Sequence, residues 1–574
     1  MRTLFRYLKP RLGRISLVLV VKTMGTLAEL MLPYILSHIL KNVVGSQSVY
    51  KILTWGGIML LFAGLALVCH ITANRKAARI SRDFSEDVRR DLFDKTLRLS
   101  SAQTDKFTIA SLESRITTDT YNVHHFVGMM QRMGVRAPIL LIGGIAITLV
   151  MDSFLALGMI VLLPFIFCIV YFISRNGVPL YAKVQQSVDK MIRVVREDVM
   201  GIRVIKALSK SEYEHNRYEK VNKNLVKDET KAGVIMGSVN PIMTLLMNMG
   251  LVLVVAMSAT RVANHTSDPE TVIAFMQYFT QISMAMMTVT RIFVMYTKSS
   301  ASAKRIAEVL NTEDELSEKS VNEYPDISTD SHIVFDDVTF SYNGKKNDLE
   351  NVSFELKKGQ SLGVIGATGS GKSTIIRMLL RFYDVKSGHV YIKGRDIHTI
   401  DRNELYSYFG TALQNDFLYA DTIEENIRFG RNLSKEQIVA AAKIAQADDF
   451  INDFEDGYNH LLSPKGTNIS GGQKQRLFIS RAIADKPEIL ILDDSTSALD
   501  YRTELMLRRA LNENFSDTTV ITVAQRVSAV KNCDLVIVID NGRIIGIGNH
   551  DELMESCVEY KEISNSQMGG AFVD

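Results

Sequence analysis

Cysteine is scarce in this sequence. The 574 residues include four cysteines, widely spaced along the chain: Cys69, Cys168, Cys533 and Cys557. Two of them lie in apolar runs and two in the more polar half, and no pair has the spacing of a metal site. We therefore expect neither a disulfide framework nor a cysteine-based metal centre.

A strong charge of one sign is also lacking. The formal net charge is +3, from 66 Lys and Arg against 63 Asp and Glu. This balance gives no general attraction to nucleic acid, and we expect no nucleic-acid partner. The start, MRTLFRYLKPRLGR, is basic and partly amphipathic, and no small-residue cleavage site follows it. It is predicted as an interfacial helix and not as a removed signal peptide.

Long apolar runs, in contrast, fill one half of the chain. A length of 574 residues exceeds one ordinary domain, so at least two folding units are expected. Residues 1–300 are crowded with apolar runs, and residues 331–574 have the mixed composition of a soluble α/β domain. Residues 301–330 are predicted as the linker. The sequence thus predicts a multi-domain protein, an all-α domain followed by an α/β domain.

Six runs in the first half are long enough to cross a membrane. A helix needs about 20 apolar residues to cross the ~30 Å hydrocarbon core. The predicted spans are 15–41, 52–73, 127–150, 154–174, 234–260 and 271–296. Only Met-Asp-Ser separates the third span from the fourth, so these two should form a tight hairpin. We expect a multi-pass protein of the cell membrane that contacts lipid.

Lysine and arginine gather on alternate connections between these spans. The N-terminus, residues 73–100 and residues 184–221 are rich in both, whereas 42–51, 151–153 and 261–270 are short and poor in charge. By the positive-inside rule, both termini and the two long connections face the cytoplasm. The long connections carry apolar residues at helical spacing, so they should extend the spans as helices.

Glycine is concentrated where a phosphate-binding loop is expected. SLGVIGATGSGKSTIIRMLLRF (361–382) has an apolar strand, a glycine-rich turn and an amphipathic helix around G-x-x-x-x-G-K-[ST]. The backbone N–H groups of such a loop surround phosphates, while Lys372 reaches the β- and γ-phosphates and Ser373 ligates Mg²⁺. The predicted nucleotide-binding residues of this loop are Gly366, Ala367, Thr368, Gly369, Ser370, Gly371, Lys372, Ser373 and Thr374.

A second motif, ILILDDSTSALD (489–500), is an apolar strand that ends in two carboxylates. At the end of such a strand, Asp493 would hold Mg²⁺ and complete the site with the phosphate loop. The alternative is structural, with both carboxylates capping a helix that follows. The presence of the phosphate loop favours the magnesium interpretation.

The motif between these two resembles a family signature. NISGGQKQRL (468–477) is similar to the signature of ATP-binding cassette (ABC) proteins, and the motif order over about 331–565 is that of this family. The resemblance implies that Tyr342 stacks on adenine, that Gln414 senses Mg²⁺ and the attacking water, and that Asp500 lies in a turn between sites. The signature residues that would face a partner's ATP are Ser470, Gly471, Gly472 and Gln473.

The first half resembles the membrane domain of exporter-type half-transporters of the same superfamily. SLESRITTD (111–119), EDVMGIRVIKAL (197–208) and ASAKRIAEVL (301–310) carry this resemblance. It implies the type IV (type I exporter) fold, in which six transmembrane helices precede a P-loop cassette with a helical subdomain. It also implies coupling helices near 105–115 and 207–215. In the family two cassettes pair head to tail around ATP, so the working unit should be a dimer.

Two residues depart from the family's pattern at the hydrolytic step. Asp494 stands where the family usually has a catalytic glutamate, and Gln525 stands where it has a histidine beside the γ-phosphate. The aspartate is shorter by one methylene, about 1.5 Å, and a glutamine takes no proton at neutral pH. The pattern resembles the degenerate half of heterodimeric bacterial multidrug exporters, whose non-identical partner supplies Glu and His. We predict an ATP-hydrolysing transporter subunit whose own site, with ATP and Mg²⁺, is impaired.

Two other functions stay open. One is a homodimeric multidrug exporter in which Asp494 serves as base, and the other is a regulatory or channel-like subunit that binds ATP. The architecture also does not separate import from export. The cargo could be an amphiphilic drug, a lipid or a peptide.

Charged and polar residues inside the spans are candidates for a cargo cavity, because such residues are costly in a membrane. Lys22 and Glu29 lie two helical turns apart on the first span; the alternative for Lys22 is that it snorkels to the interface. The candidates are Lys22, Glu29, Gln277 and Gln281, together with His38, His70 and Arg291.

Overall fold

The computed structural model describes residues 2–44, 48–263, 269–313, 316, 318–414 and 416–568. The chain folds as two compact units. We call them the helical unit (Met1–Leu97 with Ile109–Thr312) and the α/β unit (Arg98–Thr108 with Glu313–Asp574).

The helical unit consists of long helices. They are α1 (Arg2–Leu8), α2 (Leu12–His38), α3 (Val49–Leu97), α5 (Ile109–Ser114), α6 (Thr120–Met133), α7 (Arg136–Met151), α8 (Ser153–Met200), α9 (Ile202–Ala207), α10 (Ser211–Gly237), α11 (Val239–Ala263) and α12 (Pro269–Leu310). Two π-helical turns, Ile39–Val43 and Arg115–Asp119, follow α2 and α5.

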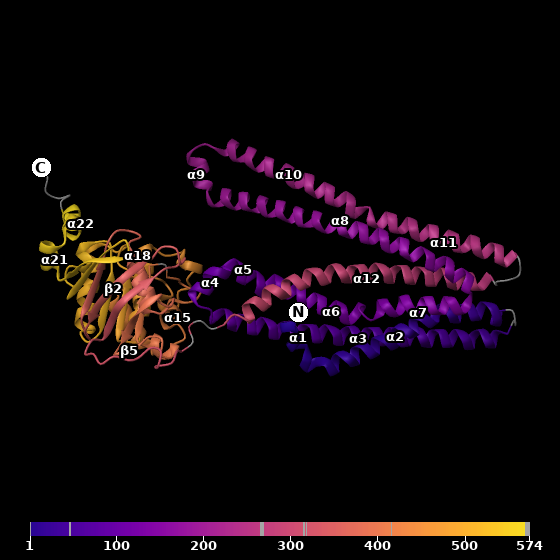
Figure 1. The fold of residues 1–574 in the computed structure, drawn as a ribbon, viewed down its shortest axis with the longest axis horizontal. Coiled ribbons are helices and arrows are strands. Elements are labelled where there is room, and N and C mark those ends of the chain that lie inside the picture. Colours follow the sequence, from indigo (N-terminus) through magenta and orange to yellow (C-terminus); the bar gives the residue numbers. More distant parts are fainter. Residues whose placement is uncertain are drawn as a thin grey trace. The chain divides into compact units, whose positions relative to one another are not determined.

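Two groups of helices make up this unit. α2 packs along α3, and α12 packs along α6 and α7, whereas α8 pairs mainly with α10, with α9 joining their ends (Figure 1). A core of apolar side chains holds the first group together, with Leu30, Tyr278 and Ile282 almost fully buried. The Tyr278 hydroxyl donates a hydrogen bond of 2.6 Å to the carbonyl of Leu30, so α12 is also joined to α2 by a polar contact.

Within the described residues, five helices are long and apolar enough to cross a membrane: Thr3–Val43, Val49–Leu97, Ile109–Met151, Thr244–Arg261 and Glu270–Leu310. They overlap five of the six predicted spans. The remaining span, 154–174, falls in α8, where many side chains lie outside the described residues, and it stays a prediction. The predicted loops at 42–51 and 261–270 also lie partly outside them.

The tight hairpin between the third and fourth predicted spans turns on one residue. Asp152 alone separates α7 from α8, and its Oδ1 accepts hydrogen bonds from the backbone N–H groups of Phe154 (3.0 Å) and Leu155 (3.3 Å). This N-cap satisfies donors that the first turn of α8 would otherwise leave free. Its Oδ2 lies 3.4 Å from Nε of Arg261 on α11, which ties the turn to a third helix.

The end of α12 is joined to the start of α6 by buried polar contacts. The Asp119 carboxylate is 1% exposed and pairs with Arg305, and it accepts a 2.8 Å hydrogen bond from Ser302. Ala303, Ile306 and Val309 of the same helix are fully buried. Because of this packing, residues 301–310, predicted as the start of the linker, are instead the last turns of α12.

The α/β unit contains two sheets. One has the order β2 (Leu349–Leu356), β1 (Ile333–Phe340), β4 (Ser387–Ile392), β5 (Arg395–Asp396) and is antiparallel. The other has the order β10 (Arg543–Gly548), β9 (Leu535–Asp540), β3 (Ser361–Ile365), β8 (Thr519–Val523), β7 (Ile489–Asp493), β6 (Phe409–Ala412). All neighbours in this second sheet are parallel except β10. Its parallel strands are mostly buried, as expected for a sheet covered on both faces.

Helices pack on these sheets around several apolar cores, of which two are large. One core joins both sheets with α13 (Lys372–Leu379) and α14 (Arg402–Ser407). The second forms a helical subdomain. Its helices are α15 (Ile423–Arg428), α16 (Lys435–Ile444), α17 (Asp448–Asn452), α18 (Gly471–Ile483) and α19 (Tyr501–Asn514). The helices α20 (Val527–Val530), α21 (His550–Ser556) and α22 (Val558–Met568) complete the unit.

One short helix changes the predicted domain boundary. α4 (Ser101–Phe107) lies inside the predicted 1–300 domain but packs in the α/β unit. Its Gln103 donates a 2.9 Å hydrogen bond to the carbonyl of Glu313, and its Asp105 accepts a 2.7 Å hydrogen bond from the hydroxyl of Tyr383. Of the two predicted coupling helices, the first (105–115) is therefore divided between α4 and α5. The range predicted for the second (207–215) runs from the last residue of α9 (Ile202–Ala207) into the start of α10 (Ser211–Gly237), and its coupling role stays a prediction.

Candidate functional site

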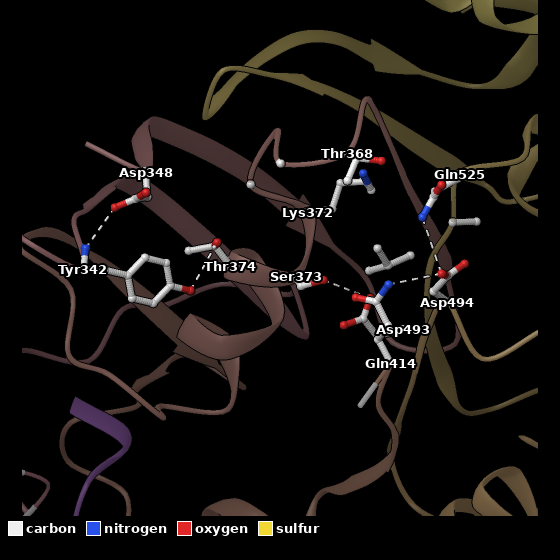
Figure 2. Close-up of a pocket in the computed structure, with 14 residues that line it drawn as sticks. Tyr342, Asp348, Thr368, Lys372, Ser373, Thr374, Gln414, Asp493, Asp494 and Gln525 are labelled. Atoms are coloured by element: carbon white, nitrogen blue, oxygen red, sulfur yellow. Dashed lines mark hydrogen bonds between the residues drawn. The ribbon is translucent and has the colours of Figure 1, made fainter. Parts of the chain in front are cut away.

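A pocket of about 270 Å³ lies at the carboxyl end of β3 and its neighbours in the parallel sheet. Figure 2 shows its 14 lining residues. They are Tyr342, Asp348, Thr368, Gly369, Gly371, Lys372, Ser373, Thr374, Gln414, Asp493, Asp494, Val523, Ala524 and Gln525. The motifs predicted from separate parts of the sequence therefore meet here, as ligand sites do at strand ends of open parallel sheets. Of the predicted loop residues, Gly366, Ala367 and Ser370 do not line the pocket.

Two glycines let the phosphate loop take its shape. A Cβ on Gly366 would lie 2.1 Å from the carbonyl oxygen of Ile539, so no other residue fits beside β9. Gly371 has φ 110°, which side chains disfavour, and it immediately precedes the first residue of α13. The loop therefore passes from β3 into the N-terminus of α13, whose first residues, Lys372, Ser373 and Thr374, line the pocket.

Lys372 and Asp493 both line the pocket and are both largely buried. The Lys372 ammonium donates to the carbonyls of Gly366 (2.8 Å) and Ala367 (2.7 Å), and burial lowers its pKa. Burial also raises the pKa of the Asp493 carboxyl, although the Ser373 hydroxyl, 3.1 Å from its Oδ1, opposes this. Burial therefore disfavours the charged forms of both the Lys372 ammonium and the Asp493 carboxylate.

The residues present fit a magnesium nucleotide. A hydroxyl and a carboxylate 3.1 Å apart supply oxygen ligands of the kind that Mg²⁺ takes. The Ser370 hydroxyl is buried without a hydrogen-bond partner among the described residues, at the loop that would surround phosphates. Gln414, the third predicted metal ligand, lines the same pocket.

Tyr342 closes the other end of the pocket. Its backbone N–H donates to Asp348 Oδ2 (2.9 Å), and its hydroxyl donates to the hydroxyl of Thr374 (3.3 Å) (Figure 2). The same hydroxyl accepts a hydrogen bond from Arg377 (2.8 Å). The Tyr383 ring packs edge-on against it, with 5.1 Å between ring centroids. Sequence reasoning missed Asp348 and Arg377, because neither stands in a recognisable motif.

Asp494 receives two amides on one oxygen. Gln414 Nε2 lies 3.3 Å and Gln525 Nε2 lies 3.5 Å from Asp494 Oδ2, although the three residues come from three distant segments (Figure 2). The Asp494 backbone is left-handed, with φ 51°, and its N–H donates to the carbonyl of Val523 at 2.9 Å. The two departures from the family pattern thus lie in direct contact.

The signature residues and Asp500 lie outside the pocket lining. Ser470 caps α18: its hydroxyl accepts from the Gln473 N–H (3.3 Å), and the Gln473 side chain accepts from the Ser470 N–H (2.8 Å). Gly471 and Gly472 form the first turn of the same helix. Asp500 caps α19, which begins at Tyr501. The alternative in which Asp493 and Asp494 cap the next helix is therefore wrong.

Two of the cavity candidates in the helical unit, Lys22 and Glu29, have polar partners. Lys22 is 4% exposed, and its ammonium donates to Asn74 Oδ1 at 3.2 Å. Glu29 pairs with Arg136 (2.6 Å) and His70 (3.1 Å). On α12, Gln277 is exposed, and Gln281 Oε1 is buried without a hydrogen bond among the described residues.

Comparisons with known proteins agree with this arrangement. Residues 15–286 match the family model of the ABC transporter transmembrane region, and residues 349–497 match that of the ABC transporter domain. The chain is 32% identical to the uncharacterized ABC transporter ATP-binding protein YfiB of Bacillus subtilis over 99% of both chains. It is 30% identical to an uncharacterized ABC transporter ATP-binding protein of Mycobacterium tuberculosis, over 99% of this chain and 98% of the relative.

A solved structure shows the fold. The ATP-bound structure of a bacterial Atm1-family ABC exporter superposes with a TM-score of 0.82 at 23% identity, covering 99% of both chains. The predicted fold class, a helical transmembrane domain of the type IV exporter fold followed by a P-loop cassette, is confirmed. With both family regions present and the whole chain aligned, this protein belongs to the ABC transporter family and is an ATP-hydrolysing membrane transporter subunit.

Proposed function

We propose that this chain is one half of a heterodimeric exporter. Its own site binds ATP with Mg²⁺ and hydrolyses it slowly, and its signature completes a faster site on a non-identical partner. The observation that carries the proposal is the contact of Gln414 and Gln525 with one oxygen of Asp494.

In that contact, the residues around Asp494 provide no group that transfers a proton during hydrolysis. Asp494 Oδ2 accepts from two neutral amides, and Gln525 offers no imidazole that could take or return a proton. The Asp494 N–H is bonded to Val523, and its carbonyl accepts from Gln475 at 3.3 Å. Because the backbone is held on both sides, it does not shift to compensate for the shorter side chain. A displacement of ~1 Å can cost ~100-fold in rate.

The groups that hold a nucleotide are retained. Lys372, Ser373, Asp493 and Tyr342 all line the pocket. A phosphate beside Lys372 and a cation beside Asp493 would each relieve the cost of a buried charge. Gln525 can also donate a hydrogen bond to a terminal phosphate. Retention of ATP without efficient turnover is consistent with this set of residues.

The signature supports the need for a partner. Ser470, Gly471 and Gly472 lie at the start of α18 and do not line the pocket of their own chain. Exporters of this family act as dimers of half-transporters, and a homodimer here would have two impaired sites. We propose a partner with Glu and His at the positions of Asp494 and Gln525.

The membrane half completes the proposal. The distribution of Lys and Arg supports a multi-pass protein of the cell membrane with both termini on the cytoplasmic side. The cargo class is an amphiphilic drug, a lipid or a peptide, expelled when ATP closes the cassettes.

The test is the ATPase activity of the purified chain alone and with a co-expressed half-transporter that has Glu and His at these positions. The proposal expects low turnover alone and high turnover together, abolished by replacing the partner's glutamate but only slightly affected by Asp494→Asn. Robust turnover of this chain alone, lost on Asp494→Asn, would support the homodimeric exporter instead. ATP binding without turnover in either preparation would support a regulatory or channel-like subunit.

A further inference from the structure

The C-terminal helix α22 holds the loop that carries Gln525. The Gln567 side chain accepts a hydrogen bond from the Val527 N–H at 2.8 Å and donates one to the Gln525 carbonyl, also at 2.8 Å. A carboxamide is both donor and acceptor, so one side chain fixes the backbone at two points of a three-residue segment.

The first turn of α20 (Val527–Val530) lacks a side-chain cap from its own N-cap residue. Val527 begins the short helix α20, and the residue at its N-cap, Arg526, makes no capping hydrogen bond from its side chain. Arginine has no acceptor and cannot satisfy the free N–H of a first turn. The cap comes instead from Gln567, 40 residues further along the chain.

The helix that provides Gln567 is firmly packed. Tyr560 of α22 is fully buried in an apolar cluster with Ile365, Ala524 and Val527. Its hydroxyl lies 2.8 Å from Nδ1 of His550. Ile365 ends β3 and Ala524 follows β8, so this cluster joins α22 to the carboxyl ends of two central strands and to α20. A rigid support of this kind is what keeps a functional side chain in place.

The contacts continue from this segment into the nucleotide pocket. Gln525 is exposed and reaches Asp494 Oδ2 at 3.5 Å (Figure 2). An exposed glutamine samples many rotamers, and its position over the pocket depends on where its backbone is held. Movement of the 525–527 backbone would move the Gln525 amide directly.

We propose that Gln567 is a positioning residue of the nucleotide site. It does not touch the nucleotide and acts through Gln525, by fixing the loop so that the Gln525 amide faces the terminal phosphate. The last described turn of α22 is thereby part of the machinery that retains ATP. This role is independent of whether the partner is identical.

The test is a double-mutant cycle of Gln567→Met and Gln525→Ala in the full-length transporter, purified with its partner subunit. The transporter is loaded with photoreactive 8-azido-ATP and Mg²⁺, and excess nucleotide is removed. Samples are irradiated at successive times, and the amount of label cross-linked to this chain measures the nucleotide still bound. Gln567→Met keeps the length of the side chain and removes both hydrogen bonds, so we expect label loss about three- to tenfold faster. Asn565→Met, a change on an exposed residue of the same helix, should leave the rate unchanged.

The cycle separates positioning from general stability. If Gln567 acts through Gln525, the double variant loses label no faster than Gln525→Ala alone. Unchanged retention in Gln567→Met, or effects that multiply in the double variant, would overturn the proposal. Gln567→Glu keeps the acceptor for Val527 and removes the donor to Gln525, so its rate should be intermediate. If Gln567→Met does not accumulate, the same cycle run with Gln567→Glu decides the question.

Discussion

The double change Asp494→Glu and Gln525→His should convert the slow site into a faster one. Glutamate extends the carboxylate by about 1.5 Å, one bond length, and a positioned histidine commonly contributes ~10²–10⁴-fold in proton transfer. Since the Asp494 backbone is held by Val523, the added length projects into the pocket rather than displacing the chain. We expect turnover at this site to rise about 100-fold, near the value of a ~1 Å correction in position.

The left-handed backbone at Asp494, with φ 51°, limits this gain. Aspartate tolerates this conformation better than most residues, and a glutamate there should cost about 1 kcal/mol of stability. The rate is best measured as phosphate release in a single turnover, with the partner's own catalytic glutamate replaced so that only this site contributes. Asp494→Asn with Gln525→His is the matched control and should stay slow.

A fall in melting temperature without a gain in rate would refute this reasoning. It would mean that an aspartate stands at 494 for its backbone conformation, and that the slow step lies elsewhere. A gain from Gln525→His alone, with no further effect of Asp494→Glu, would place the defect in the missing imidazole.

Three further changes test the structure. Asp493→Asn should raise the melting temperature of the nucleotide-free protein near pH 7 and abolish Mg²⁺-dependent ATP retention. Burial raises the pKa of the Asp493 carboxyl, so the stabilising contribution of this group is lost as pH rises through that pKa. The gain in melting temperature should therefore shrink in thermal scans at lower pH. Arg305→Ala should destabilise the helical unit by about 3 kcal/mol, because it leaves the Asp119 carboxylate, 1% exposed, without its cation. Asp119→Asn should destabilise it less, and equal melting temperatures of the two variants would contradict this reasoning. Tyr383→Phe removes the 2.7 Å hydrogen bond to Asp105, so amide exchange in α4 should quicken while the melting temperature stays the same, and unchanged exchange would argue against this contact.

Much of the nucleotide pocket could be predicted from short segments. The phosphate loop and the strand ending at Asp493 each carry their chemistry within a few residues, and the structure brings both to one pocket. Asp348 could not be predicted, because an acidic residue before a strand has no distinguishing spacing. The same holds for Gln567, which lies far from any motif and matters only through the loop it contacts.

The boundaries of the two units show a second limit. Apolar periodicity predicted long helices, and it overlaps five helices long enough to cross a membrane. It did not indicate that α4 packs with the α/β unit, or that α12 continues to Leu310. Those outcomes depend on hydrogen bonds between distant segments, such as Gln103 to Glu313, which local composition does not encode.

By itself, the sequence determined which chemistry this protein carries: membrane-spanning helices, a phosphate loop and a magnesium carboxylate, set by local spacing and hydrophobic period, and a signature identified by its resemblance to the family's. Only the tertiary structure decided that Gln414, Asp494 and Gln525 meet at one oxygen, and that α22 supports the last of them. The physical reason is the strand order β3-β8-β7-β6. Parallel strands that are far apart in the chain end side by side only after their crossover helices have packed on the sheet.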